Sequence, residues 1–265
     1  MVNNVSEFAQ LVAIAREGAY GWAVRRVHIV PECGSTQDEA RALVAKGDAE
    51  GTVVIAGRQT AGRGRLGRAW VDERGLGVAA TFIVDAGAGA PFLSLAAGLA
   101  AHRAAQVALP EGVRLGLRWP NDVVEAPREE GGPRRKLAGV LVEVIGTTAL
   151  VGIGVNVKQG DSDWPGELSA KAVSVSQLGS AWSRAQVVDA LASMFSMCMS
   201  KPAHELASAW QRLDTLVGTT RSFEHNGSRV SGEVVRIDPL ARITLRVAGG
   251  EELHLPALST SLVHE

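Results

Sequence analysis

The chain has 265 residues, enough for one large domain or for a large domain and a small one. Hydrophobic residues make up 46% and charged residues 21%, ordinary values for a globular protein, and the formal net charge of -1 argues against a basic surface for nucleic acid. No apolar stretch reaches the roughly 18 residues of a membrane span, and the first residues lack the pattern of a secretory signal. We therefore expect a cytoplasmic protein without membrane or nucleic-acid partners.

The two cysteines, Cys33 and Cys198, are far apart, and neither belongs to a CxxC pair. Isolated cysteines in a chain of this size predict free thiols in a reducing compartment. They also argue against a zinc site.

Hydrophobic periodicity and turn residues predict helices and strands along the first part of the chain. In chain order, these elements are a helix over 6–17, a strand near 24–30, a helix within 34–47, a strand over 52–57, a strand over 75–84 and a helix over 91–109. Ser35 is a natural N-cap for the second helix, and Asp38 stands where a capping partner belongs.

Two further strands are predicted over 136–145 and 149–157, as antiparallel neighbours joined by a short break. The segment 125–135 before them is rich in Pro, Gly and charge, which predicts an exposed, mobile loop. Two helices separated near Pro202 are expected within 184–213.

The chain changes character at about Gly218. From there on, short β-runs are broken by Asn-Gly, Asp-Pro and Gly-Gly turns, which predicts a small all-β unit, a barrel. We place the linker near 214–218, which divides the chain into domains over 1–215 and 216–265.

The segment 58–70, RQTAGRGRLGRAW, carries the strongest local signal. It has arginines and interleaved glycines but no acid: Arg58, Arg63, Arg65, Arg68, Gly62, Gly64 and Gly67. Glycines let the backbone approach a ligand, and each guanidinium can grip a carboxylate or phosphate in a forked geometry. We expect a flexible loop that orders around an anionic ligand. A solvated loop or an RG-type nucleic-acid tail is the alternative, disfavoured because the loop lies between two buried-looking strands.

Four motifs in order resemble those of biotin–protein ligases. The GRGRLGRAW stretch (62–70) resembles the glycine–arginine motif of that family. GSTQD (34–38) resembles its STN turn, RWPND (118–122) resembles its KWPND, and KLAGVLVE (136–143) with GIGVN (152–156) resembles its paired central strands. Together the motifs span about 120 residues, and the overall likeness covers nearly the whole chain from about residue 25.

The resemblance implies a mixed α/β catalytic domain, with helices flanking a mixed sheet, and a small C-terminal barrel of the Src-homology-3 kind. It also implies a reaction in two halves. The biotin carboxylate attacks the α-phosphate of MgATP, which gives biotinyl-5'-AMP and pyrophosphate. A lysine ε-amine then attacks this adenylate and releases AMP. The implied partner is the biotin carboxyl carrier protein, or carrier domain, of a biotin-dependent carboxylase such as acetyl-CoA carboxylase.

The resemblance assigns biotin binding to residues from three of the four motifs and to one glutamine beside them: Ser35, Thr36, Gln37, Gln59, Arg63, Gly64, Arg65, Lys136, Gly139 and Gly152. The family usually has Asn where this chain has Gln37, and Ser35 can serve as a helix cap as well as a ligand contact. Gly139 and Gly152 are expected to be small because the flat biotin ring lies against their strands, with a β-bulge as the alternative.

For the nucleotide, the resemblance points to Arg63, Arg65, Arg68, Trp70, Asn121, Asp122 and Asn156. Trp70 is expected to stack on or pack under the adenine, with a place in the core as the alternative. Asp122 is expected to help hold Mg²⁺, which needs only one or two carboxylates when phosphate oxygens supply the rest; bracing the loop is its other reading.

Lys136, Arg63 and Arg65 are the predicted catalytic residues. Lys136 opens a strand of mostly apolar residues, so a rigid backbone would hold its ammonium. The expected role is a fixed positive charge between the biotin carboxylate and the α-phosphate. The alternative is a lysine at the start of a strand that faces water.

Three other functions compete with this one. A lipoate– or octanoate–protein ligase shares the general fold but lacks GRGRxGR. A biotin-sensing transcriptional repressor needs a DNA-binding domain, for which the residues before the first matched strand are too few. A non-catalytic biotin-binding module would have no use for the loop arginines and Lys136. Exposed sheet edges also leave a homodimer open.

Overall fold

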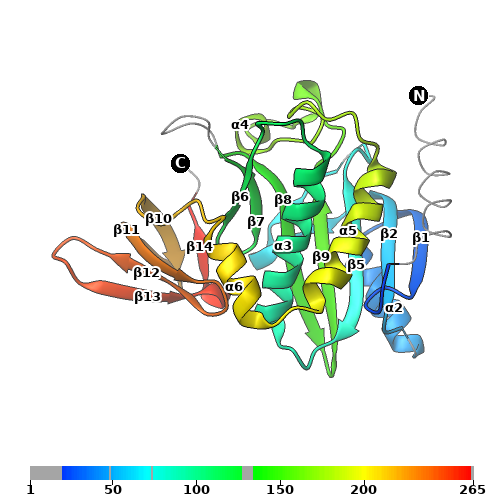
Figure 1. Ribbon diagram of the computed structural model, residues 1–265, viewed down its shortest axis with the longest axis horizontal. Coiled ribbons are helices and arrows are strands. Elements are labelled where there is room, and N and C mark those ends of the chain that lie inside the picture. The colour runs from blue at the N-terminus through cyan, green and yellow to red at the C-terminus, as the bar shows by residue number, and fades with distance from the viewer. Residues whose placement is uncertain (1–19, 48, 73, 127–133, 264–265) are drawn as a thin grey trace.

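The computed structural model describes residues 20–47, 49–72, 74–126 and 134–263, and its larger part is a seven-stranded mixed sheet flanked by helices (Figure 1). From edge to edge, the strands are β1 (Arg26–Cys33), β2 (Thr52–Gln59), β5 (Val78–Asp85), β9 (Thr148–Val155), β8 (Lys136–Ile145), β7 (Asp122–Glu125) and β6 (Leu115–Arg118). β1 and β2 pair in parallel, and the other neighbours pair antiparallel. The predicted helix over 6–17 and most of the predicted loop over 125–135 lie outside the described residues.

Helices cover the two faces of this sheet unequally. α3 (Ala90–Ala108) and α5 (Arg184–Met199) pack together on one face, and α6 (Ala203–Gln211) lies beside α3. On the other face, the shorter α2 (Thr36–Lys46) packs against β2, β5 and β9. That face is therefore only partly covered by α2.

Alternate residues of β9 show what each face holds, because successive side chains of a strand point to opposite sides. Val151 and Ile153 are buried in the main core, which includes residues of α3 and α5. Leu150 points the other way and packs under α2. The next two positions on its face are Gly152 and Gly154, which place no side chain on this face of the sheet.

The C-terminal residues form a second sheet of five antiparallel strands. Its order is β13 (Glu252–Pro256), β12 (Arg242–Arg246), β11 (Ser228–Asp238), β10 (Thr220–His225) and β14 (Thr260–Leu262). The sheet lies beside β6 and β7 (Figure 1), and the rings of Phe223 and Trp119 meet edge-on with centroids 6.4 Å apart. Leu117 of β6 exchanges backbone hydrogen bonds with Leu213 and Thr215, so the start of the predicted linker is fastened to the sheet edge.

The helices and strands predicted within the described residues are confirmed, as is the small all-β unit. The structure adds β6, β7, a hairpin of β3 (Gly62–Arg63) and β4 (Ala69–Trp70), and α4 (Leu168–Lys171). These elements have two to four residues each, too few to show a period. No described helix has both the length and the apolar character needed to cross a membrane.

Both cysteines are free and buried, as the sequence predicts for isolated thiols. Burial, together with Glu39, Asp38 and Glu32 nearby, raises the pKa of Cys33 to about 11. The thiol is therefore protonated and unreactive at neutral pH.

Candidate active site

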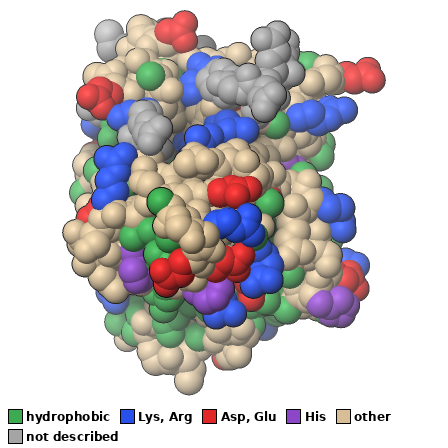
Figure 2. Space-filling view, turned by 90° about the vertical axis from the view of Figure 1, so that its left-hand side faces the viewer, with side chains coloured by type: hydrophobic (Ala, Val, Ile, Leu, Met, Phe, Trp, Pro, Cys, Tyr) green, Lys and Arg blue, Asp and Glu red, His purple; other side chains and the backbone are tan. Residues whose placement is uncertain are grey.

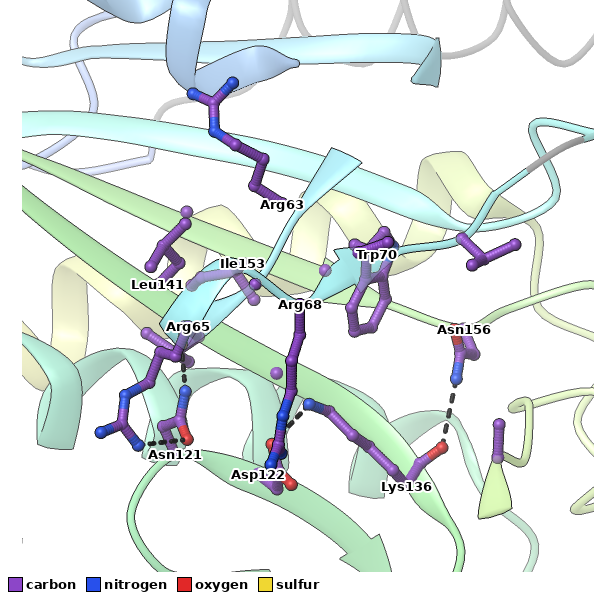
Figure 3. Close-up of a pocket in the computed structure, with 18 of the residues that line it drawn as sticks. Arg63, Arg65, Arg68, Trp70, Asn121, Asp122, Lys136, Leu141, Ile153 and Asn156 are labelled. Atoms are coloured by element: carbon purple, nitrogen blue, oxygen red, sulfur yellow. Dashed lines mark hydrogen bonds and ion pairs between the residues drawn. The ribbon is translucent and has the colours of Figure 1, made fainter. Parts of the chain in front are cut away.

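A pocket of about 330 Å³ opens on the face of the sheet that α2 leaves uncovered. It collects the site residues predicted from all parts of the sequence: Ser35, Thr36, Gln37, Gln59, Arg63, Gly64, Arg65, Arg68, Trp70, Asn121, Asp122, Lys136, Gly139, Gly152 and Asn156. Many of them surround one cavity in Figure 3. The structure thus brings these residues together around one pocket, and their roles stay predictions.

One end of the pocket is a network of neutral hydrogen bonds at the start of α2. Gln59 Oε1 accepts from the Thr36 amide at 2.7 Å and from the Thr36 hydroxyl at 3.0 Å. The Thr81 hydroxyl in turn donates to the Thr36 hydroxyl at 2.8 Å. Ser35 Oγ caps the helix by accepting from the Gln37 amide at 3.3 Å, which confirms the predicted N-cap.

Gln37 completes this end. Its Nε2 donates to the carbonyl of Leu141 at 3.2 Å, which fixes the direction of the amide. Its Oε1 is buried and has no hydrogen-bond partner among the described residues. A buried acceptor without a partner is costly, so a ligand that donates a hydrogen bond here gains affinity.

Gly152 and Gly154 are small for reasons that the sequence did not reveal. A Cβ on Gly152 would lie 3.0 Å from Gln37 Nε2, and one on Gly154 would lie 2.6 Å from two carbons of the Trp70 indole. Both glycines therefore make room for protein side chains. Trp70 lies across the pocket floor, and the Lys136 ammonium is 5.6 Å from its ring centroid (Figure 3).

The arginine–glycine segment is folded as a hairpin of β3 and β4 around a tight turn at 65–67. Leu66 in this turn has a φ of 54°, in the left-handed region that non-glycine residues rarely adopt. Arg63 binds both carboxylate oxygens of Asp38 at 2.7 Å, and these bonds lower the pKa of Asp38. The expectation that Asp38 is a capping partner is therefore wrong, because its carboxylate binds Arg63 and not the backbone of its own helix. Arg58 pairs with Glu32 at 2.9 Å in an exposed ion pair and is not among the residues that line the pocket.

Arg65 and Arg68 reach the C-terminal sheet. Arg65 Nη2 donates to the carbonyl of Ala257 and Nη1 to Asn121 Oδ1 at 3.4 Å. Arg68 Nη2 donates to Ser261 Oγ at 3.2 Å. Burial lowers the pKa of Arg65 from its ordinary value, although an arginine stays charged at any physiological pH. The C-terminal sheet is thus part of the site.

Charged groups of β6, β7 and β8 meet in the middle of the pocket. Asp122 Oδ1 lies 2.6 Å from Lys136 Nζ, and Asp122 Oδ2 lies 2.9 Å from Arg118 Nη2. Burial opposes ionisation of Asp122, but the two cations outweigh it and lower the pKa of this carboxyl to about 2. Asp122 is therefore an anion at neutral pH.

This arrangement does not fit the predicted role of Asp122 as a magnesium ligand. Both of its oxygens are already held by cations. The described residues also contain no cluster of three or more His, Cys, Asp or Glu side chains that could hold a metal ion. In this structure Asp122 pairs with Arg118 and Lys136, and its alternative role of bracing the loop stays a prediction.

Two asparagines hold the remaining strand ends. Asn121 Nδ2 donates to the carbonyl of Val140, and Asn156 Nδ2 donates to the carbonyls of Lys136 and Val173 at 3.1 and 3.2 Å. Asn156 thus ties the first residue of β8 to the end of β9.

Several pocket residues were missed as site residues from the sequence: Arg118, Gly154, Trp164, Lys171 and Ser261. Arg118 is the first residue of the RWPND motif, and Asp122, which it contacts, is the last. The presence of both charges in one motif is a signal that the sequence does contain. Ser261 carries no signal, because only the docking of the C-terminal sheet brings it to the pocket.

The fold and the pocket define an α/β ligase of the kind described by the Biotin/lipoate A/B protein ligase family, whose model matches residues 35–159. The biotin--[acetyl-CoA-carboxylase] ligase of Mycobacterium tuberculosis is 34% identical over 256 residues, 89% of this chain and 90% of that protein. The bifunctional ligase/repressor BirA of Bacillus subtilis is 34% identical over 151 residues, 54% of this chain and 44% of that protein. The biotin protein ligase of Aquifex aeolicus, solved with biotin and ATP, superposes with a TM-score of 0.75 at 24% identity, over 91% of this chain and 100% of that one.

The chain belongs to the biotin protein ligase family. The match to the mycobacterial ligase runs through nearly the whole length of both proteins, well beyond the residues that the family model matches.

Proposed function

We propose that this protein activates biotin with MgATP and attaches it to one lysine of a biotin carboxyl carrier protein. The observation that carries the proposal is the order of groups along β9. Gln37 lies over Gly152, Trp70 and the Lys136 ammonium lie over Gly154 and its cross-strand partner Gly139, and Asn156 follows the end of the strand. Biotinyl-5'-AMP has the same order, with an uncharged ring, a charged phosphate and a nucleoside.

The first half-reaction uses the cations. The ring occupies the neutral end, where Ser35, Thr36 and Gln37 contact it, and the carboxylate reaches the arginine loop. A carboxylate oxygen attacks the α-phosphorus, and the bond to the leaving pyrophosphate breaks with its electron pair. Negative charge grows on the phosphoryl oxygens, and Lys136 stabilises it as a fixed positive charge. Magnesium enters with ATP as part of that substrate.

The second half-reaction needs the adenylate to survive until the carrier arrives. The lysine ε-amine attacks the acyl carbon, the bond to AMP breaks, and the proton of the amine passes to solvent. Arg65 and Arg68 lie over the pocket and hold the loop against the C-terminal sheet, where they keep water from the mixed anhydride.

The neutral end favours biotin over lipoate or octanoate, the substrates of the alternative in this fold. A ureido ring offers N–H donors and a carbonyl to buried groups such as Gln37 Oε1 and Gln59. An octanoyl chain offers neither and would leave Gln37 Oε1 unpaired, and such a mismatch can cost a factor of about 10⁴.

A DNA-binding repressor is the second alternative, and one relative is named a ligase/repressor. On the face of the C-terminal sheet in Figure 2, basic side chains are interspersed with acidic ones. Arg246, for example, pairs with Glu233 and Glu252. This mixture supports our expectation of no nucleic-acid partner. The cytoplasmic location and the open question of a homodimer stay as predicted from the sequence.

The test is to incubate the protein with MgATP, a carrier domain and one of three acids: biotin, lipoate or octanoate. We expect mass spectrometry to show one added biotinyl group on a single lysine, only when ATP is present. If biotin and ATP bind but the carrier mass does not change, the protein is a biotin-binding module and not a ligase. If lipoate or octanoate is transferred faster than biotin, the protein is the alternative ligase.

A further inference from the structure

Lys136 reaches its position by an unusual path. Asp122 and Gly139 are paired residues of neighbouring strands β7 and β8. The Lys136 side chain starts three residues before Gly139 and runs over it, so that a Cβ on Gly139 would lie 2.7 Å from Nζ and 2.8 Å from Cε. Beyond Gly139, the ammonium meets Asp122 Oδ1 at 2.6 Å (Figure 3).

Gly139 has no other evident reason to be glycine. Its φ is outside the left-handed region, so alanine could adopt the same backbone conformation. The third neighbour of a Cβ here would be a Trp70 ring carbon at 3.4 Å, which is nearly ordinary contact. The close conflict is with the end of Lys136, a flexible side chain that would move aside. An alanine would therefore preserve the strand and displace the ammonium.

Arg118 holds the other side of Asp122. It lies opposite Asp122 in the β6–β7 pairing and is only 6% exposed. One guanidinium nitrogen binds Asp122 Oδ2 at 2.9 Å, and the other binds the carbonyl of Arg134 at 3.1 Å. With Arg118 present, the group of two cations and one carboxylate keeps one net positive charge. Without it, Asp122 would cancel Lys136.

We propose that Gly139, Asp122 and Arg118 form a seat for the Lys136 ammonium, and that they act in the ligase reaction as positioning residues. Gly139 leaves the path across the strand open, Asp122 fixes the charge at its end, and Arg118 orients Asp122 and offsets its charge. Freezing a long lysine side chain before the substrates bind is preorganisation, and it raises the rate because no reorganisation is needed during the reaction. The catalytic role of these residues rests on the proposed function, whereas the seat that fixes the position of the Lys136 ammonium does not.

The first test needs no substrate. The chain contains five lysines, so the ¹⁵N resonances of their ammonium groups can be followed by NMR in the full-length protein, with Lys136→Arg identifying the signal. We expect Gly139→Ala and Arg118→Met to shift or broaden that signal, and Arg118→Lys to retain it. Gly152→Ala is the matched control, because its Cβ faces Gln37 instead. A Lys136 signal unaffected in both Gly139→Ala and Arg118→Met would overturn the seat.

The second test separates the seat from the alternative role of Gly139 as a floor for the biotin ring. In a pyrophosphate-release assay, the seat predicts that Gly139→Ala lowers kcat by about 10²-fold, the cost of a misplaced catalytic group, with KM for biotin nearly unchanged. Arg118→Met should also lower kcat, and Arg118→Lys should restore most of it. A raised KM for biotin with unchanged kcat in Gly139→Ala contradicts the seat. If the wild type releases no pyrophosphate, the proposed function fails while the NMR result still decides the seat.

Discussion

The two faces of β9 differ in what their side chains do. On the face toward α3 and α5, Val151 and Ile153 fill a closed core. On the opposite face, Leu150 is followed by Gly152 and Gly154, and the space above these glycines is taken by Gln37 and Trp70 of the pocket. A single strand therefore supports the fold with one set of positions and the chemistry with the other. Substitutions on the two faces should fail in different ways.

The largest expected effect is on the core face. Val151→Asp places a carboxylate with no partner at a fully buried position. Such a group costs more than about 4 kcal/mol, enough to unfold many domains. We expect loss of the cooperative unfolding transition in circular dichroism. If the variant unfolds within about 1 kcal/mol of wild type in urea, a size far below that burial cost, then this face is not the closed core described here.

On the pocket face, Lys136→Ala should preserve the fold and stop the chemistry. The side chain is a third exposed, so its loss opens no cavity in the core. Losing one preorganised charge contact typically costs about 10²–10³ in rate. We expect pyrophosphate release to fall by that factor, while biotin binding by calorimetry changes little and the variant still unfolds cooperatively. A mutant rate within a few-fold of wild type would remove Lys136 from the mechanism.

The charge cluster of the pocket should also show in the pH dependence of stability. The pKa of Asp122 is about 2 in the folded protein and 3.8 ordinarily, so the folded state favours the anion. Its contribution, on the order of 2 kcal/mol, is fully present above pH 4 and is lost as the pH falls toward 2. Urea unfolding between pH 2 and 7 measures it. Asp122→Asn should flatten the curve below pH 4, and an unchanged slope would be evidence against the two ion pairs.

The smallest change in rate, together with a visible change in selectivity, is expected for a substitution in the arginine–glycine hairpin. Arg65→Gly removes the contacts with Ala257 and Asn121. We expect adenylate formation to continue while the adenylate escapes, so that added bystander proteins become biotinylated at exposed lysines. A streptavidin blot detects them, with Arg58→Gly as the control because Arg58 pairs outside the pocket. Labelling confined to the carrier would mean that Arg65 does not retain the adenylate.

The sequence predicted the elements that have a period and the residues that stand in motifs. It placed Lys136 at the start of a strand and Ser35 at a helix cap, because both depend on a few neighbouring residues. It did not predict contacts between distant segments. Asp38 binds Arg63 instead of capping its own helix, and Asp122 meets Lys136 from a neighbouring strand, because only the folded sheet brings these pairs together.

The hydrogen bonds between Leu117 and residues 213–215 bear on protein engineering. They satisfy backbone groups of β6, which is otherwise the outermost strand of its sheet. A shortened catalytic core ending near residue 215 would lose the sheet that holds this segment in place. The exposed strand would then offer unpaired N–H and C=O groups to another molecule, the usual route to aggregation. A fusion at the C-terminus beyond β14 keeps that protection, and a minimal version of the protein needs a designed cap.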